Sequence, residues 1–208
     1  MENLVLKEEQ RDCLQELVNV AMGQAGDSLA RYLEVFVELS VPRVRIIQID
    51  QLHLELNLLA NHATSVSAVR QGFYDACDGN GMRGEAIVIF GDASFKELSE
   101  LLAYDEPLTA ASEEEMLLDI TNVLNGACLS GIGEQIENEL AFSPPSVIGR
   151  HIPPEAVVQK DKVDWDKALM VEINYKVENR SFQCGLLLLM PKDVICVVID
   201  ALDRLLEE

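Results

Sequence analysis

Two stretches with helical spacing carry the same line of polar residues, in which an acidic residue is followed three positions later by an asparagine. The two lines are Asp12, Glu16, Asn19 and Gly23, and Glu115, Asp119, Asn122 and Gly126. At 100° per residue each line falls on one helix face, opposite the apolar residues. Asn and Gly each cost a helix interior up to about 1 kcal/mol relative to Ala. Carboxylates and carboxamides at such costly positions indicate a surface that a partner approaches.

Each feature also has a purely structural explanation. Exposed Glu and Asp usually do no more than keep a helix face solvated, and Glu115 would complete a capping box that begins at Ser112. Gly23 and Gly126 could let two long helices pack closely, or could leave a low spot for another surface. Because the acid-x-x-Asn pairs recur at one offset along the chain, each structural explanation must hold twice, which favours a functional use.

The two lines belong to a longer internal repeat. The segments ELVN at 16–19 and DITN at 119–122 lie 103 residues apart, and the strand-like segments that begin at Gly84 and Gly185 lie 101 residues apart. Each copy reads as a long helix, extended segments, a glycine-led strand and a helix. Because no linker rich in Pro, Gly or Ser separates the copies, we predict one domain over residues 1–208, with repeat halves at about 7–105 and 112–206.

Periodicity and turn residues predict the elements that position these lines. Helical spacing covers residues 7–33, 93–103, 112–140 and 192–206, and strand-like segments lie at 35–41 and 44–49. Two hairpins are expected, one from 66–76 and 84–90 around the turn signal DGNG, the other from 168–177 and 182–190. Residues 153–166 are expected to form a mobile loop.

Composition narrows the class of partner and the compartment. Lys and Arg number 16 against 36 Asp and Glu, and the net charge of −20 argues against nucleic acid or an anionic membrane as the main partner. Five cysteines without a CxxC pair are typical of reduced thiols in a cytoplasmic protein. The first residues carry charges where a signal peptide needs an apolar run, and no apolar stretch is long enough to span a bilayer.

Motifs of metal and nucleotide sites are absent from the sequence. Its three histidines, His53, His62 and His151, are isolated, so no zinc site is expected. No phosphate-binding loop and no nucleophile motif occurs. We therefore expect no metal or cofactor of the protein's own, and any reaction would borrow part of its site from a partner.

The paired lines resemble the duplicated signature of the CheC/CheX/FliY family, phosphatases that act on the phosphorylated chemotaxis response regulator. The resemblance rests on Asp12-x3-Glu16-x2-Asn19 followed by Pro42, and on Glu115-x3-Asp119-x2-Asn122 followed by Pro144. It extends over nearly the whole chain. Two signature copies resemble CheC more than single-site CheX, and FliY is expected to fit less well because no extra N-terminal peptide or C-terminal switch domain is seen. The family implies an α/β fold with internal pseudo-two-fold symmetry, whose signature helices lie side by side over a largely antiparallel sheet.

The resemblance also implies roles for the residues of both lines. The two asparagines would orient the water that attacks an aspartyl phosphate, and Glu16 and Asp119 would pair with a lysine of a CheY-like receiver domain. Mg²⁺ would be supplied by that receiver. The remaining residues of the lines would contact the partner, namely Asp12, Gly23, Glu115 and Gly126.

The second copy departs from the family pattern at two positions. Asp119 stands where Glu is preferred, and Glu115 stands where Asp or Ser is usual. Because Asp is one methylene shorter than Glu, about 1.5 Å of reach is lost. The first site is therefore expected to be intact and the second to be impaired.

Two other classes of function fit the same residues. The helices could bind a receiver without hydrolysing its phosphate, or serve as an adaptor for a partner such as a CheD-like protein. The chain could also be a duplicated interaction or structural protein whose acidic helices are merely solvated. Phosphate release from a phosphorylated receiver distinguishes the first function from these two.

Overall fold

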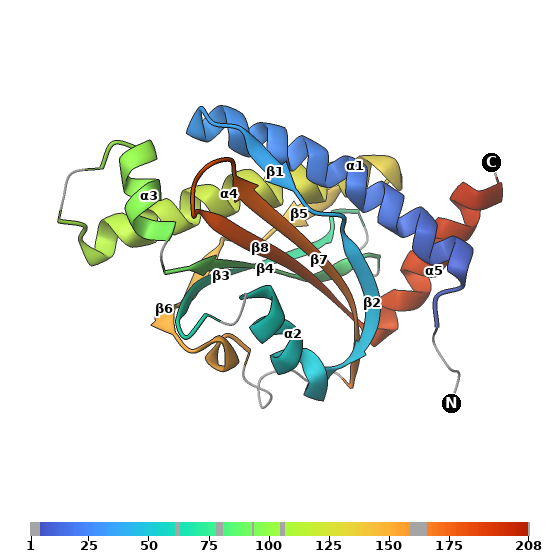
Figure 1. The fold of residues 1–208 in the computed structure, drawn as a ribbon. Coiled ribbons are helices and arrows are strands. Elements are labelled where there is room, and N and C mark those ends of the chain that lie inside the picture. The colour runs from blue at the N-terminus through green and yellow to red at the C-terminus, as the bar shows by residue number, and fades with distance from the viewer. Residues whose placement is uncertain are drawn as a thin grey trace.

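Two long helices lie side by side across one face of a curled sheet in the computed structural model of the chain (Figure 1). The structure describes residues 5–60, 63–77, 81–92, 94–104, 107–158 and 166–207. Its helices are α1 Glu8–Leu33, α2 Leu52–Leu59, α3 Ser94–Leu101, α4 Ala110–Gln135 and α5 Lys192–Glu207. Its strands are β1 Val37–Leu39, β2 Arg43–Gln48, β3 Val66–Asp75, β4 Arg83–Gly91, β5 Leu140–Phe142, β6 Ser146–Ile152, β7 Lys167–Val177 and β8 Gln183–Pro191. Short 3-10 turns lie at Ile49–Gln51 and Pro154–Ala156.

The eight strands of the described residues form one antiparallel sheet with internal two-fold symmetry. Their order is β1-β7-β8-β4-β3-β5, with β2 also paired to β7 and β6 to β3. Exchange of β1–β4 with β5–β8 only reverses this order. The edge strands of each half pair with the hairpin of the other half, so the two halves exchange their edge strands.

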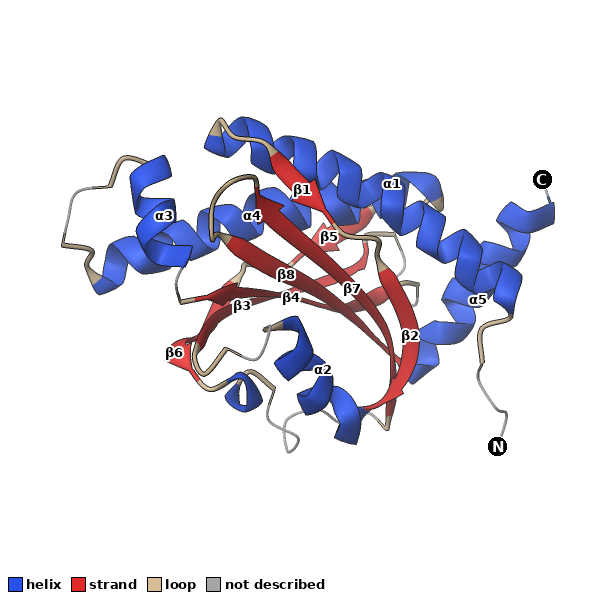
Figure 2. Cartoon of the chain, in the orientation of Figure 1, coloured by secondary structure: helices blue, strands red, loops and turns tan. Residues whose placement is uncertain are grey.

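Helices cover both faces of the sheet (Figure 2). On one face, the larger core packs α1 and α4 against alternate residues of the central strands, such as Val171 and Ile173 of β7. On the other face, α2 covers a smaller core that includes Leu52, Leu56 and Leu187. The central strands are therefore apolar on both faces, as expected for strands buried between two layers.

The two long helices form because their apolar residues recur every three or four positions. The buried residues include Leu14, Val18, Ala21, Ala25 and Leu29 in α1, and Leu117, Ile120, Leu124 and Cys128 in α4. This confirms the buried faces expected from the periodicity. Because these faces pack on the sheet, both polar lines turn outward.

Both predicted ends of α4 are wrong. The helix begins at Ala110 with Thr109 as its N-cap, and Thr109 Oγ1 accepts a hydrogen bond from the backbone N–H of Ser112 at 3.1 Å. Ser112 is thus the partner of the capping box, and Glu115 has no capping role. At the other end the helix stops at Gln135, because Glu137 adopts a left-handed φ of 54° and the chain turns into β5.

Several further elements differ from the expectations. The sequence does not predict α2, in which buried Leu52 and Leu56 alternate with exposed Leu54 and Leu58, so that apolar residues surround the helix and mask its period. The repeat predicts extended segments after the second long helix but not their bounds; they are β5 and β6, whose residues are mostly half-buried at the sheet edge. The expected loop at 153–166 begins with a 3-10 turn, and its residues 159–165 lie outside the described residues.

The two expected hairpins are confirmed. Strands β3 and β4 pair from Val66↔Gly91 to Tyr74↔Arg83, and β7 pairs with β8 in the equivalent place. Residues 78–80 of the DGNG turn lie outside the described residues.

Candidate functional site

The first polar line lies on the outer face of α1. The side chains of Asp12, Glu16 and Asn19 are exposed, and Gly23 stands one turn further along. Apart from its own helix, no described atom lies within 4 Å of the position that a Cβ of Gly23 would take. The line therefore forms an open strip, with a low spot at one end, that another molecule can reach.

Glu16 and Asn19 have no hydrogen-bond or ion-pair partner within the described part of the chain. Asp12 contacts the guanidinium of Arg11 at 3.4 Å, an exposed pair of little energetic weight. One helical turn separates Glu16 from Asn19, so the carboxylate and the carboxamide project to the same side. Both are free to engage an incoming partner.

The second polar line, on α4, differs because its carboxylates are already engaged. The hydroxyl of Tyr32, in the last turn of α1, donates a hydrogen bond to Oδ2 of Asp119 at 3.1 Å. The phenol of Tyr104, which precedes α4, lies beside the carboxylate of Glu115, whose charge contributes to raising the pKa of Tyr104. The two acidic side chains of this line therefore each face a phenol.

The amide and the glycine of the second line match those of the first. Asn122 is exposed and has no hydrogen-bond partner among the described residues. Gly126 has open space where its Cβ would lie. The two lines thus present the same asparagine and glycine, and differ in what their carboxylates contact.

Burial and nearby negative charge raise the pKa of both phenols further above the physiological range. Burial first, and then the charge and hydrogen bond of Asp119, raise the pKa of Tyr32 to about 12. Burial and the Glu115 carboxylate also raise the pKa of Tyr104. Both hydroxyls therefore stay hydrogen-bond donors over the physiological pH range.

The helices α1 and α4 run antiparallel in close contact. Gln135 at the end of α4 donates from Nε2 to the carbonyl of Leu17 at 2.9 Å, whereas Tyr32 at the end of α1 reaches Asp119. At Gly131 a Cβ would lie only 3.2 Å from the backbone of α1. The two polar lines are therefore related by the symmetry of the repeat and occupy opposite ends of the helix pair.

Sequence reasoning misses Tyr32 and Tyr104, because each meets its carboxylate only through the fold. Along the chain, 87 residues separate Tyr32 from Asp119. A usable signal is a break in the repeat, since the residue 103 positions after Tyr32 is Gln135 and not a second phenol. The structure establishes where the side chains of the two polar lines lie, and not which reaction they carry out. The chemical roles assigned to them therefore stay predictions.

His151 is not isolated, contrary to the expectation from the sequence. Its Nδ1 lies 3.2 Å from Oδ1 of Asp92, and its Nε2 lies 3.4 Å from Oε2 of Glu113, which also pairs with Arg150 at 2.7 Å. Burial alone would lower the pKa of His151, but the two carboxylates outweigh it and raise the pKa. The cluster ties the end of β6 to the turn after β4 and to the first turn of α4.

Three further properties concern the described residues as a whole. Within the described ranges, no three His, Cys, Asp or Glu side chains are placed to hold one metal ion, and His62 lies outside these ranges. All five cysteines are free thiols, of which Cys128 and Cys184 are buried. None of the described helices has the length and apolar character that a membrane span requires.

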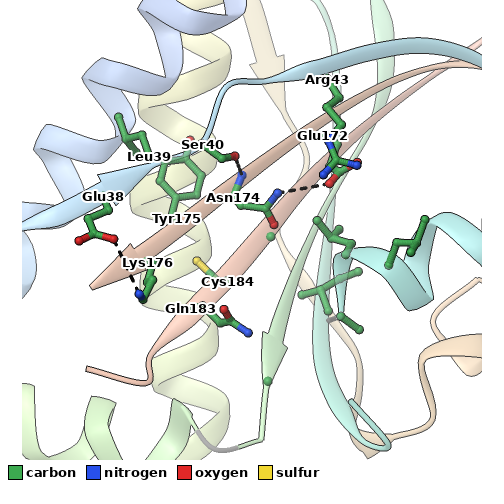
Figure 3. A pocket seen from close by; sticks show the side chains of 16 residues that line it. Glu38, Leu39, Ser40, Arg43, Glu172, Asn174, Tyr175, Lys176, Gln183 and Cys184 are labelled. Carbon is green, nitrogen blue, oxygen red and sulfur yellow. Dashed lines mark hydrogen bonds and ion pairs between the residues drawn. The ribbon is translucent and has the colours of Figure 1, made fainter. Parts of the chain in front are cut away.

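A cleft of about 390 Å³ lies on the other face of the sheet, between β1, β7, β8 and α2 (Figure 3). In it, the Glu172 side chain is 4 % exposed, accepts a hydrogen bond from the Asn174 amide at 3.3 Å and lies 3.8 Å from Arg43. An ion pair of 3.8 Å joins Lys176 to Glu38 at the rim. The residues that line this cleft include none of the two polar lines, which are strips on the opposite surface.

Solved structures of known proteins share this architecture. FliY from Thermotoga maritima matches with a TM-score of 0.67 and 17% identity, over 96% of this chain and 98% of that chain. A CheX protein from Desulfovibrio desulfuricans matches with a TM-score of 0.53 and 17% identity, over 83% of this chain and 99% of that chain. A CheC-like protein from Shewanella oneidensis MR-1 matches with a TM-score of 0.54 and 11% identity, over 83% and 95%. The chain has the CheC/CheX/FliY fold.

The resemblance read from the polar lines is therefore confirmed at the level of the fold. The confirmed features are the mixed α/β class, the antiparallel sheet, the internal two-fold symmetry and the pair of long helices. No family model matches the sequence. Identities of 11% to 17% establish the fold alone, so the function has to be argued from the two polar lines.

Proposed function

We propose that the protein is a phosphatase of response regulators, which hydrolyses the aspartyl phosphate of a CheY-like receiver domain in chemotaxis or a related two-component pathway. The observation that carries the proposal is the Glu16–Asn19 pair, exposed on α1 and without a partner among the described residues. The fold supports it, because proteins of the FliY and CheX type share it. With such a partner the protein would act in the cytoplasm.

Asn19 acts on the water in this proposal. The water oxygen attacks phosphorus while the bond from phosphorus to the aspartate oxygen of the receiver breaks, which releases inorganic phosphate and the free carboxylate. The neutral carboxamide of Asn19 can accept a hydrogen bond from the water and donate another. It brings no negative charge against the phosphoryl oxygens, as a carboxylate would. Positioning of this kind is the main contribution that a protein makes to phosphoryl transfer.

Glu16 fixes the position of the partner. Its carboxylate pairs with a lysine of the receiver, and Asp12 extends the acidic strip by one turn. Because one turn separates Glu16 from Asn19, both side chains can reach the same pocket of the receiver. Gly23 keeps the helix surface low beside them. The Mg²⁺ that neutralises the phosphoryl charge belongs to the receiver.

The second line on α4 repeats this arrangement in a weaker form. Asn122 can orient a water as Asn19 does, and Gly126 provides the same low surface. Asp119 has the shorter side chain and already accepts a hydrogen bond from Tyr32. We therefore expect most of the activity to come from the line on α1.

Phosphate release tests the proposal. A CheY-like receiver is phosphorylated with acetyl phosphate in a Mg²⁺ buffer and mixed with the protein. Asn19→Ala should slow release about a hundredfold, the loss typical of a mispositioned reactant, and leave receiver binding unchanged. Glu16→Ala should weaken binding, and Asn122→Ala, the matched control, should have little effect. Full activity in the Asn19→Ala/Asn122→Ala double variant would show the mechanism to be wrong.

The same experiment separates the other functions. Binding of the phosphorylated receiver without faster release would indicate a receiver-binding protein or an adaptor, for instance for a CheD-like partner. Absence of both binding and release would indicate that the acidic strips only solvate the helices.

A further inference from the structure

The carboxylates of the two polar lines have different contacts with neighbouring side chains, although the repeat predicts equivalent contacts. Asp119 accepts a hydrogen bond from the Tyr32 hydroxyl at 3.1 Å, and the phenol of Tyr104 lies beside the Glu115 carboxylate. The two phenols come from different elements, the end of α1 and the segment before α4. The second line is therefore held at Asp119 and faces a second phenol one turn earlier, at Glu115.

The internal symmetry supplies the comparison with the first line. The residue equivalent to Tyr32, 103 positions later, is Gln135. Its Nε2 donates to the backbone carbonyls of Leu17 at 2.9 Å and Gly131 at 3.1 Å, and not to Glu16. Within the described residues, the same helix pair thus holds one signature carboxylate and leaves its counterpart free.

Hydrogen bonds to carboxylates are among the stronger ones in proteins. A receiver lysine that approaches Asp119 has to compete with the Tyr32 hydroxyl, and one that turns to Glu115 has to compete with Tyr104. Tyr32 is 39% exposed, and exposure reduces what such a contact is worth. Together the two contacts should weaken docking by about three- to tenfold.

We propose that Tyr32 and Tyr104 determine which of the two sites turns over the receiver, because they hold Asp119 and Glu115 and so weaken docking at the second site. This inference rests on the proposed function. The two tyrosines are positioning residues, since they act through the carboxylates and do not touch the phosphoryl group. The first site, whose Glu16 has no such contact among the described residues, carries the turnover.

The experiment isolates the second site in a Glu16→Ala/Asn19→Ala background. Adding Tyr32→Phe and Tyr104→Phe removes both donors and keeps both rings. KM for the phosphorylated receiver should fall about three- to tenfold with kcat unchanged, a split that a role in packing alone would not produce. Tyr74→Phe, on an exposed tyrosine of β3 outside both lines, is the matched control and should change neither constant.

An unchanged or higher KM in the double Phe variant overturns the inference. In that case the proposed function stands if the wild-type chain releases phosphate and Asn19→Ala does not. If the wild-type chain releases none, the proposed function fails, and binding of a receiver loaded with beryllium fluoride, which mimics the acyl phosphate, decides the inference. Tighter binding by the double Phe variant then supports the weakened docking at the second site, and equal, weaker or no binding overturns the inference. Thermal unfolding checks that each variant folds.

Discussion

Replacement of Gly23 by alanine should change the stability of the protein and the docking of a partner in opposite directions. Apart from the helix itself, no described atom lies within 4 Å of the added methyl group. Alanine favours a helix interior over glycine by about 0.8–1.0 kcal/mol. In a chain of 208 residues each kcal/mol shifts the melting temperature by roughly 2–4 °C. Gly23→Ala should therefore raise Tm by about 2–4 °C.

The same methyl group should hinder docking. Gly23 stands one turn beyond Asn19 on the exposed strip, and the methyl raises the surface there by about 1.5 Å. A displacement of about 1 Å between reacting groups can cost a hundredfold in rate. We therefore expect kcat/KM for the phosphorylated receiver to fall by up to about a hundredfold while the stability rises.

Gly126→Ala is the matched control, because it adds the same methyl to the equivalent open position of α4. It should gain the same stability and lose little activity. Thermal unfolding followed by circular dichroism measures the first quantity, and phosphate release at varied receiver concentration measures the second. Full kcat/KM in Gly23→Ala would refute the docking role of the low spot, and a lower Tm would refute the argument from open space.

Three further outcomes follow from the structure. Gly131→Ala should destabilise the chain by about 1–3 kcal/mol in urea unfolding, because its methyl would press against the backbone of α1. His151 should titrate above pH 6.5 by NMR, because Asp92 and Glu113 outweigh the effect of burial. The stabilisation by protonated His151 is then complete below about pH 6.5 and disappears as the pH rises through the folded-state pKa, so His151→Gln should lower stability at about pH 6 and have little effect at about pH 9. EDTA should stop phosphate release only by removing Mg²⁺ from the receiver, and tight zinc or iron in the purified protein would contradict this.

The helices and strands with a regular pattern of buried apolar residues could be predicted from the sequence. The apolar spacing from Leu14 to Leu29 fixes both the extent of α1 and the side on which Glu16 and Asn19 lie. The glycine-led strands β4 and β8 are recognisable as apolar runs because both of their faces are covered. These features are local, so a single sequence contains them.

The features that could not be predicted depend on contacts between distant residues or on weak local patterns. The apolar residues of α2 lie on all sides of the helix, and β5 and β6 are half-buried edges, so neither shows a clear period. The end of α4 depends on the left-handed backbone of Glu137. This conformation cannot be predicted from the sequence, because residues other than glycine rarely adopt it. The contact of Tyr32 with Asp119 requires the antiparallel packing of α1 on α4, so the difference between the two sites appears only in three dimensions.

The exchange of edge strands between the two halves has a consequence for the order in which the chain can fold. Strands β1 and β2 leave the ribosome early, but both pair with β7, which is synthesised more than a hundred residues later. Pairings of such long range slow folding, because closing the loop between the strands costs entropy before the pairing stabilises the chain. The sheet of the first half is therefore incomplete until the second hairpin has emerged. Completion of the sheet has to wait until β7 and β8 have been synthesised, and a nascent chain that stalls near residue 150 should expose its edges to chaperones.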